Sequence, residues 1–185
     1  MPPRVKSLVL QHDISRLMAL LRGALRSGVP ANRYFRLGLF LLAALIAQQS
    51  IGWRWTALTG LQDNDTYKLA TGLGLLACVL YQWRFSLKRA QGEKHHAAMM
   101  MSRHRLFGAL VPLLFFIHSQ ALGYGYLELL SLTLLSAFLT GLFNLQVCQI
   151  RTSWYRPLWI TTHVGLSMAL LLLLGYHVYI NYAFK

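Results

Sequence analysis

Five long apolar segments limit what this chain can fold into. They cover residues 34–52, 67–83, 97–123, 126–147 and 157–182. A helix needs roughly 20 apolar residues to cross the hydrocarbon core of a bilayer, and these segments are close to that length or longer. Hydrophobic residues make up 56% of the 185 residues, whereas charged residues make up 12%, about half the usual share in a soluble domain. We therefore predict an all-α membrane protein in which residues 34–185 form a bundle of about five transmembrane helices.

Residues 1–33 precede the first apolar segment and have a different character. Between residues 10 and 25, leucine, isoleucine and methionine recur at helical spacing, while Arg16, Arg22 and Arg26 fall mainly off this stripe. A helix with one apolar face and one basic face binds in the plane of the membrane interface. The pattern predicts an amphipathic surface helix in this N-terminal region.

The basic residues are distributed unequally between the two ends of the predicted spans. The sequence has 18 lysines and arginines against five acidic residues, and 15 of the 18 lie on the same side as the N-terminus when five spans are assumed. Lysine and arginine concentrate in cytoplasmic loops, so we expect a multi-pass inner (cell) membrane protein with its N-terminus in the cytoplasm and its C-terminus outside. Basic loops between apolar spans indicate membrane lipid as the partner, and no nucleic acid.

Four of the seven histidines occupy only two of the apolar segments. His104 and His118 lie in one, His163 and His177 lie in another, and the two histidines of each pair are 14 residues apart. Fourteen residues of straight helix place both side chains on nearly the same face, about 21 Å apart along the axis. Because one span separates the two segments, both cross in the same direction. His104 should then lie level with His163, and His118 level with His177.

Level pairs of imidazoles on parallel helices are the arrangement that two bis-histidine iron centres require. A haem between the helices takes one imidazole on each side of its iron, and the 14-residue step stacks two haems across the bilayer. Gly108, Gly165 and Gly175 lie near the candidate ligands and would let a flat ring approach the backbone, although glycines also serve helix packing. The sequence has no CxxCH motif, which excludes covalent c-type haem.

Two other classes of function are alternatives to haem binding. The first uses buried histidines, and the second has no role for them. A proton or metal transporter would relay protons or bind a metal directly through these side chains, and it predicts acidic partners inside the bundle. Glu128 is the only acid near a span, and it lies at an outer end. A structural anchor for a larger complex has no use for four intramembrane imidazoles.

Arg103 and Arg105 flank His104 and admit two interpretations. Near the inner membrane boundary, their guanidinium groups would form charge-assisted hydrogen bonds with haem propionates. The alternative is that both side chains extend to the lipid headgroups.

The segments HRLFGALVPLLFFIH (104–118) and WITTHVGLSMALLLLLGYH (159–177) resemble the transmembrane di-haem cytochromes b. The resemblance is nearest to the ferric-reductase-like transmembrane domain shared with NADPH oxidases, and it rests on spacing and topology over residues 97–182. The respiratory cytochrome b core has a similar four-histidine arrangement. The resemblance implies haem b at both sites, with the inner haem on His104 and His163 and the outer haem on His118 and His177.

Members of that family usually continue into a domain that binds flavin and nicotinamide. This sequence ends at Lys185 and has no Gly-rich phosphate loop in a strand-to-helix context. We therefore expect electrons to come from other subunits, from a soluble reductase, from a small reductant or from quinol. Gln48, Gln49 and Ser50 are candidate quinone contacts or ordinary interfacial polar residues. The sequence thus predicts the electron-transfer subunit of a larger oxidoreductase.

Overall fold

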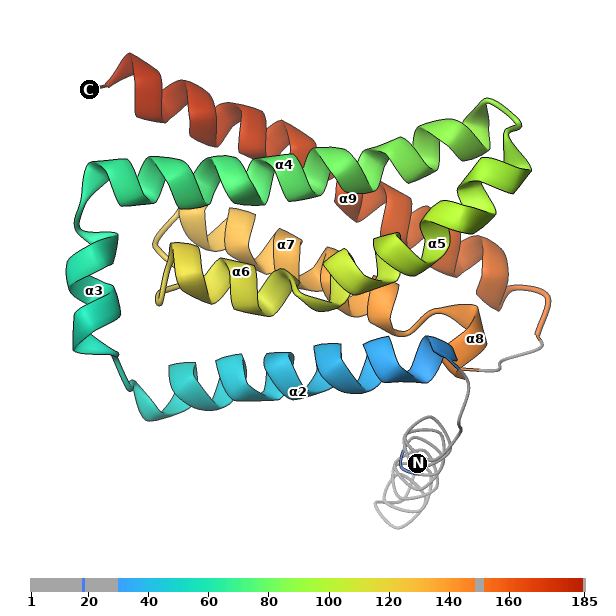
Figure 1. Ribbon diagram of the computed structural model, residues 1–185, viewed down its shortest axis with the longest axis horizontal. Coiled ribbons are helices and arrows are strands. Elements are labelled where there is room, and N and C mark those ends of the chain that lie inside the picture. Colours follow the sequence, from blue (N-terminus) through green and yellow to red (C-terminus); the bar gives the residue numbers. More distant parts are fainter. Residues whose placement is uncertain (1–17, 19–29, 149–151, 185) are drawn as a thin grey trace, which may run out of the picture.

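The computed structural model describes residues 18, 30–148 and 152–184, and this part of the chain is all-helical, without strands. The helices are α2 (Pro30–Ile51), α3 (Thr56–Gln62), α4 (Asp65–Ala90), α5 (Lys94–Ala109), α6 (Val111–His118), α7 (Tyr126–Leu142), α8 (Leu145–Cys148) and α9 (Tyr155–Ala183). Helices α5 and α6 pack on both α2 and α4, α9 packs along α7, and short α3 connects the ends of α2 and α4 (Figure 1). The N-terminal surface helix predicted for residues 1–33 falls almost entirely outside the described residues.

Helices occupy all five predicted apolar segments, but they are not equally suited to a bilayer. In α2, Arg33–Ile51 is long and apolar enough to cross a membrane, as is the whole of α9. Helices α5 and α6 add a third crossing if they count as one span, and α7 is apolar but only 17 residues long. Helix α4 is long, yet it carries charged residues in both its first and its last turn. Among the described residues, length and composition therefore support two or three membrane crossings.

The third apolar segment is broken, which corrects the prediction of one continuous span over residues 97–123. Its two helices meet at Leu110 with a bend of 43°. Pro112 at the start of α6 explains the break, because proline lacks an N–H and its ring clashes with the carbonyl of the preceding turn. The segment also ends at His118, since Ser119 is extended with φ −149°. The straight-helix relation between His104 and His118 therefore does not hold.

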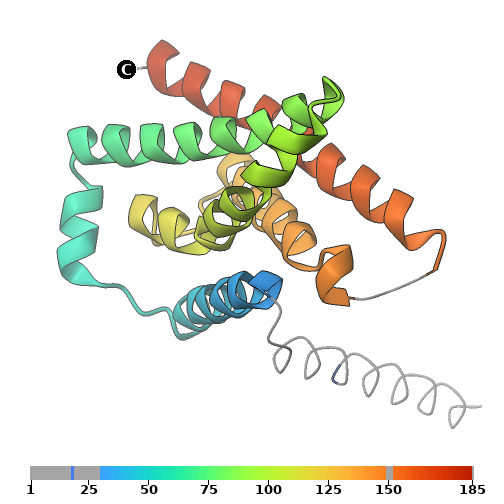
Figure 2. The same cartoon turned by 45° about the vertical axis from the view of Figure 1, so that its right-hand side comes forward.

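A compact apolar cluster fixes α6 against α2, α7 and α8. Phe35 is only 1% exposed, and it packs with Val111, Phe138, Leu142 and Val147. A Cβ atom on Gly38 would lie 2.9 Å from the Leu142 side chain, so α2 and α7 approach closely there. Helix α9 takes no part in this cluster and diverges from the other helices toward its C-terminal end (Figure 2).

Candidate functional site

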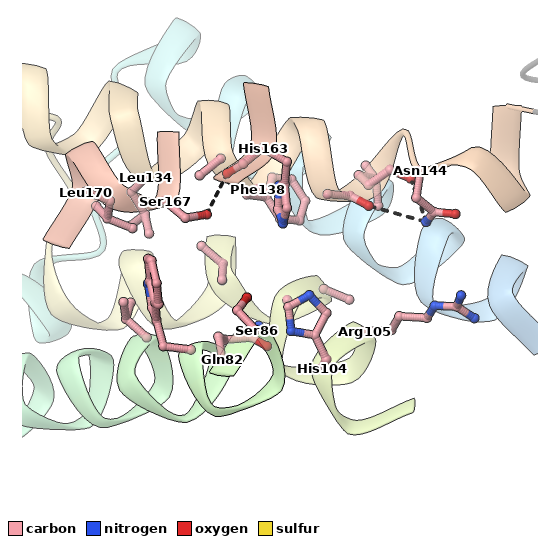
Figure 3. A pocket seen from close by; sticks show the side chains of 18 of the residues that line it. Gln82, Ser86, His104, Arg105, Leu134, Phe138, Asn144, His163, Ser167 and Leu170 are labelled. Carbon is pink, nitrogen blue, oxygen red and sulfur yellow. Dashed lines mark hydrogen bonds between the residues drawn. The ribbon is translucent and has the colours of Figure 1, made fainter. Parts of the chain in front are cut away.

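His104 and His163 come together inside the bundle, from helices that are far apart in the sequence. His104 extends from α5 and His163 from α9, and their ring centroids are 6.5 Å apart with the ring planes at 88°. Both side chains line one pocket, which they enter from opposite sides (Figure 3). The level pairing of these two histidines, derived from helix direction alone, agrees with this placement.

The pocket around this pair is mostly apolar. Its cavity volume is about 140 Å³, which is less than the roughly 300–1,000 Å³ typical of small-molecule and cofactor pockets, and part of the surrounding space is open to the exterior. Its wall combines apolar side chains with a few polar ones, including Gln82, Ser86, Asn144 and Ser167. The lining of the pocket, apolar with a few polar groups, is therefore of the kind found in cofactor sites.

A threonine and a glycine of α7 hold the ring of His163. The Oγ1 atom of Thr140 is 3.0 Å from Nδ1 of His163. A Cβ atom on Gly141 would lie 3.0 Å from Cε1 of the same ring, so the imidazole rests directly against the helix backbone. Trp159 is parallel to the ring at 5.6 Å, and its indole N–H donates to the carbonyl of Thr140 at 2.7 Å. His163 is thus fixed from three directions.

A threonine and a glycine of α4 hold the ring of His118 in the same way. The Oγ1 atom of Thr71 is 3.0 Å from Nδ1 of His118, and a Cβ atom on Gly72 would lie 3.2 Å from Cε1. Sequence reasoning missed both Thr-Gly steps. Both steps lie in the tripeptide Thr-Gly-Leu, at 71–73 and 140–142, and this repeat is the sequence feature that could have indicated them. The same tripeptide occurs at 59–61, where no histidine lies against the glycine.

The ring of His104 is packed but not hydrogen-bonded. It stacks on Phe85 with centroids 4.7 Å apart, and its Nδ1 atom is buried without a hydrogen-bond partner. The Oε1 atom of Gln82 is likewise buried and unpartnered, and it lines the same pocket. Buried polar atoms without partners are rare in proteins and often mark a site for a ligand, an ion or a water molecule. These two atoms are consistent with a pocket that is completed by a bound group.

The outer pair is arranged more loosely than the inner pair. The ring of His177 lies 6.2 Å from that of Tyr126, and the amide nitrogen of Asn181 is 3.3 Å from its Nε2 atom. His177 lies within electrostatic range of His118, but the closest ring to it in the described structure is that of Tyr126. The structure therefore brings the rings of His104 and His163 together in a T-shaped arrangement and leaves His118 and His177 farther apart.

The two arginines beside His104 have different surroundings. Arg105 lines the pocket together with His104, whereas Arg103 is exposed and does not. Near Arg105, the hydroxyl of Tyr34 accepts a hydrogen bond from Arg33 at 2.7 Å and lies 2.8 Å from Oγ of Ser102. The part of the pocket wall around Arg105 is thus polar and basic.

The glycines proposed to accommodate a flat ring differ from one another. A Cβ atom on Gly108 would lie 3.4 Å from the amide nitrogen of Gln82, whereas Gly165 and Gly175 face open space. In the described part of the chain, no three His, Cys, Asp or Glu side chains form a group that could hold a metal ion. The pocket instead brings together two imidazoles, those of His104 and His163.

Gln48 and Gln49, considered above as quinone contacts, are occupied in a buried polar network. The amide of Gln49 donates to the carbonyl of Gln120 at 2.7 Å, and that of Gln48 donates to the carbonyl of Trp53 at 2.7 Å. Gln120, only 3% exposed, accepts in turn from the backbone N–H of Trp55 at 2.8 Å. These glutamines tie the end of α2 to the segment after α6, while Ser50 is exposed.

Comparisons with models of known protein families, with curated proteins and with solved structures find no match to this chain.

Proposed function

We propose that this chain is a transmembrane electron-transfer protein that binds two haems b between the α5–α6 segment and α9. The inner haem is held by His104 and His163, and the outer haem by His118 and His177. The observation that carries the proposal is the pair His104 and His163, whose ring centroids lie 6.5 Å apart in one mostly apolar pocket.

The spacing of the inner pair fits two axial ligands of one metal. Imidazole nitrogens bind zinc at about 2.0–2.1 Å, and a ring centroid lies about 1 Å beyond its nitrogen, so two rings on opposite sides of one metal have centroids about 6–6.5 Å apart. The separation of 6.5 Å between the ring centroids of His104 and His163 agrees with this value.

Each group in the pocket has a defined task in this proposal. The bound haem supplies an iron that accepts and releases one electron at a time. His104 and His163 would bind the metal, the apolar wall would exclude water, and Arg105 would bind a propionate through charge-assisted hydrogen bonds. Exposed Arg103 is better placed to interact with lipid headgroups.

In the proposed membrane arrangement, α2, α4, α5–α6, α7 and α9 are the five spans of an inner (cell) membrane protein. The 15 basic residues on the N-terminal side support a cytoplasmic N-terminus and an outside C-terminus. The electron donor and acceptor are other protein subunits, a soluble reductase, a small reductant or membrane quinone. The network around Gln120 gives no support to a quinone site at Gln48 and Gln49, because their amide groups already donate within the protein.

Sealed liposomes provide the functional test. We expect purified protein in the bilayer to transfer electrons from an impermeant reductant outside to ferricyanide trapped inside, so that the trapped ferricyanide loses its absorbance. The variant His163→Ala should abolish this transfer because it removes an inner ligand, while His95→Ala, at an exposed position near the start of α5, should retain it. Transfer that is equally fast in liposomes without protein, or in the His163→Ala variant, would contradict the proposed function.

A further inference from the structure

The hydroxyl groups of Thr71 and Thr140 each have their one hydrogen already committed. Oγ1 of Thr71 lies 2.8 Å from the carbonyl oxygen of Tyr67, and Oγ1 of Thr140 lies 2.9 Å from that of Ala137. A carbonyl oxygen cannot donate, so each hydroxyl must be the donor in this contact. Toward the histidine, 3.0 Å away in both cases, the hydroxyl can then only accept.

This direction determines which nitrogen of each imidazole carries the proton. A neutral imidazole has one N–H and one lone pair, and the nitrogen facing an acceptor must be the N–H. His118 and His163 therefore carry the proton on Nδ1 and present the lone pair on Nε2. An imidazole that binds a metal almost always donates its other N–H to a nearby acceptor, which fixes the ring and raises its basicity.

We infer that Thr71 and Thr140 are positioning residues that fix the tautomer of His118 and His163 and strengthen their Nε2 atoms as iron ligands, one at each haem. This inference rests on the proposed function. Gly72 and Gly141 are also needed at these contacts, because a side chain at either position would push the histidine ring away from the threonine hydroxyl.

The second histidine of each pair, His104 or His177, has no such hydrogen-bond acceptor beside its ring nitrogens. Nδ1 of His104 is buried with no hydrogen-bond partner, and the group nearest the ring nitrogens of His177 is the amide nitrogen of Asn181, which is a donor. Each haem is therefore held by one imidazole with a fixed proton and one without. The fixed imidazole donates more electron density to the iron, which favours the oxidised state and lowers the reduction potential.

The test is a redox titration of purified protein, followed by its haem absorbance. In Thr140→Val, which keeps the shape of threonine but removes the acceptor, we expect the midpoint potential of one haem to rise while the other is unchanged. We also expect haem affinity at that site to fall about 10- to 100-fold, the usual effect of losing such a partner. Thr140→Ser should restore both values, because serine keeps the hydroxyl.

Matched variants keep the outcome decisive. Thr133→Val changes a buried threonine on the same helix, two turns away, and should leave both potentials unchanged. If the Thr140→Val variant binds no inner haem, the Thr71→Val variant provides the same measurement at the outer haem. In that case the Thr140→Ser variant must still bind two haems. Unchanged potentials in both valine variants, or no rescue by serine, would overturn the inference while the proposed function stands. Wild-type protein that binds no haem would instead overturn the proposed function.

Discussion

Alanine at His104 or at His163 should each remove one of the two haems, and alanine at both positions together should remove no more than either change alone. The two side chains bind the same iron in this account, so losing either one destroys the same site. Their ring centroids, 6.5 Å apart, place them as partners. Haem content per polypeptide, measured by the alkaline pyridine spectrum, should fall by half in all three variants.

Combinations across the two levels provide the contrast. His104→Ala with His177→Ala should remove both haems, since one ligand is lost at each site, and His118→Ala alone should remove only the outer haem. His95→Ala is the control, because this side chain is exposed near the start of α5. Unchanged haem content in His118→Ala, or a greater loss in the His104 and His163 double variant than in either single one, would refute the assignment of ligands.

Valine at Gly141 should displace the ring of His163 and weaken haem binding at the inner site. Even the Cβ atom would lie 3.0 Å from Cε1 of the ring, and the two γ-methyl groups of valine extend further. Overpacking of this kind costs about 1–3 kcal/mol, which corresponds to about a 5- to 150-fold loss of affinity. Valine at Gly72, whose Cβ would lie 3.2 Å from Cε1 of His118, should weaken the outer site in the same way. Haem titration of the purified variants measures both effects.

Gly74→Val is the matched control for Gly72→Val. Gly74 is on the same helix, two residues away, and a Cβ atom there would meet nothing within 4 Å. Haem affinity should therefore be unaffected by this change. Equal losses at Gly72 and Gly74 would show that valine harms α4 in general and that the glycine at the ring has no special role.

Much of the helical layout could be predicted because it follows from apolar runs. A segment without charges that is long enough to bury itself forms a helix in almost any membrane-like setting, and α2, α7 and α9 lie where the runs lie. The break at Leu110 was missed because hydropathy does not register the hydrogen bond that Pro112 cannot make. Helix α3 was also missed, since its seven residues carry no long apolar run.

Part of the candidate site could likewise be predicted from the sequence, and the rest depends on contacts between residues far apart in the chain. The pairing of His104 with His163 could be predicted because helix direction alternates with each crossing. The contacts of Thr140 with His163 and of Thr71 with His118 could not, because they span 23 and 47 residues and depend on the rotation of each helix about its axis. Periodicity in one segment does not determine that rotation, since packing against neighbouring helices sets it.

The most direct test of two bis-imidazole haems is the low-temperature electron paramagnetic resonance spectrum of the oxidised, purified protein, with the spins counted per polypeptide. The account predicts two low-spin ferric signals, each integrating to one iron per chain, because every iron has an imidazole on both sides. A spectrum with no low-spin ferric haem, or with a single signal that integrates to one iron per chain, would contradict it.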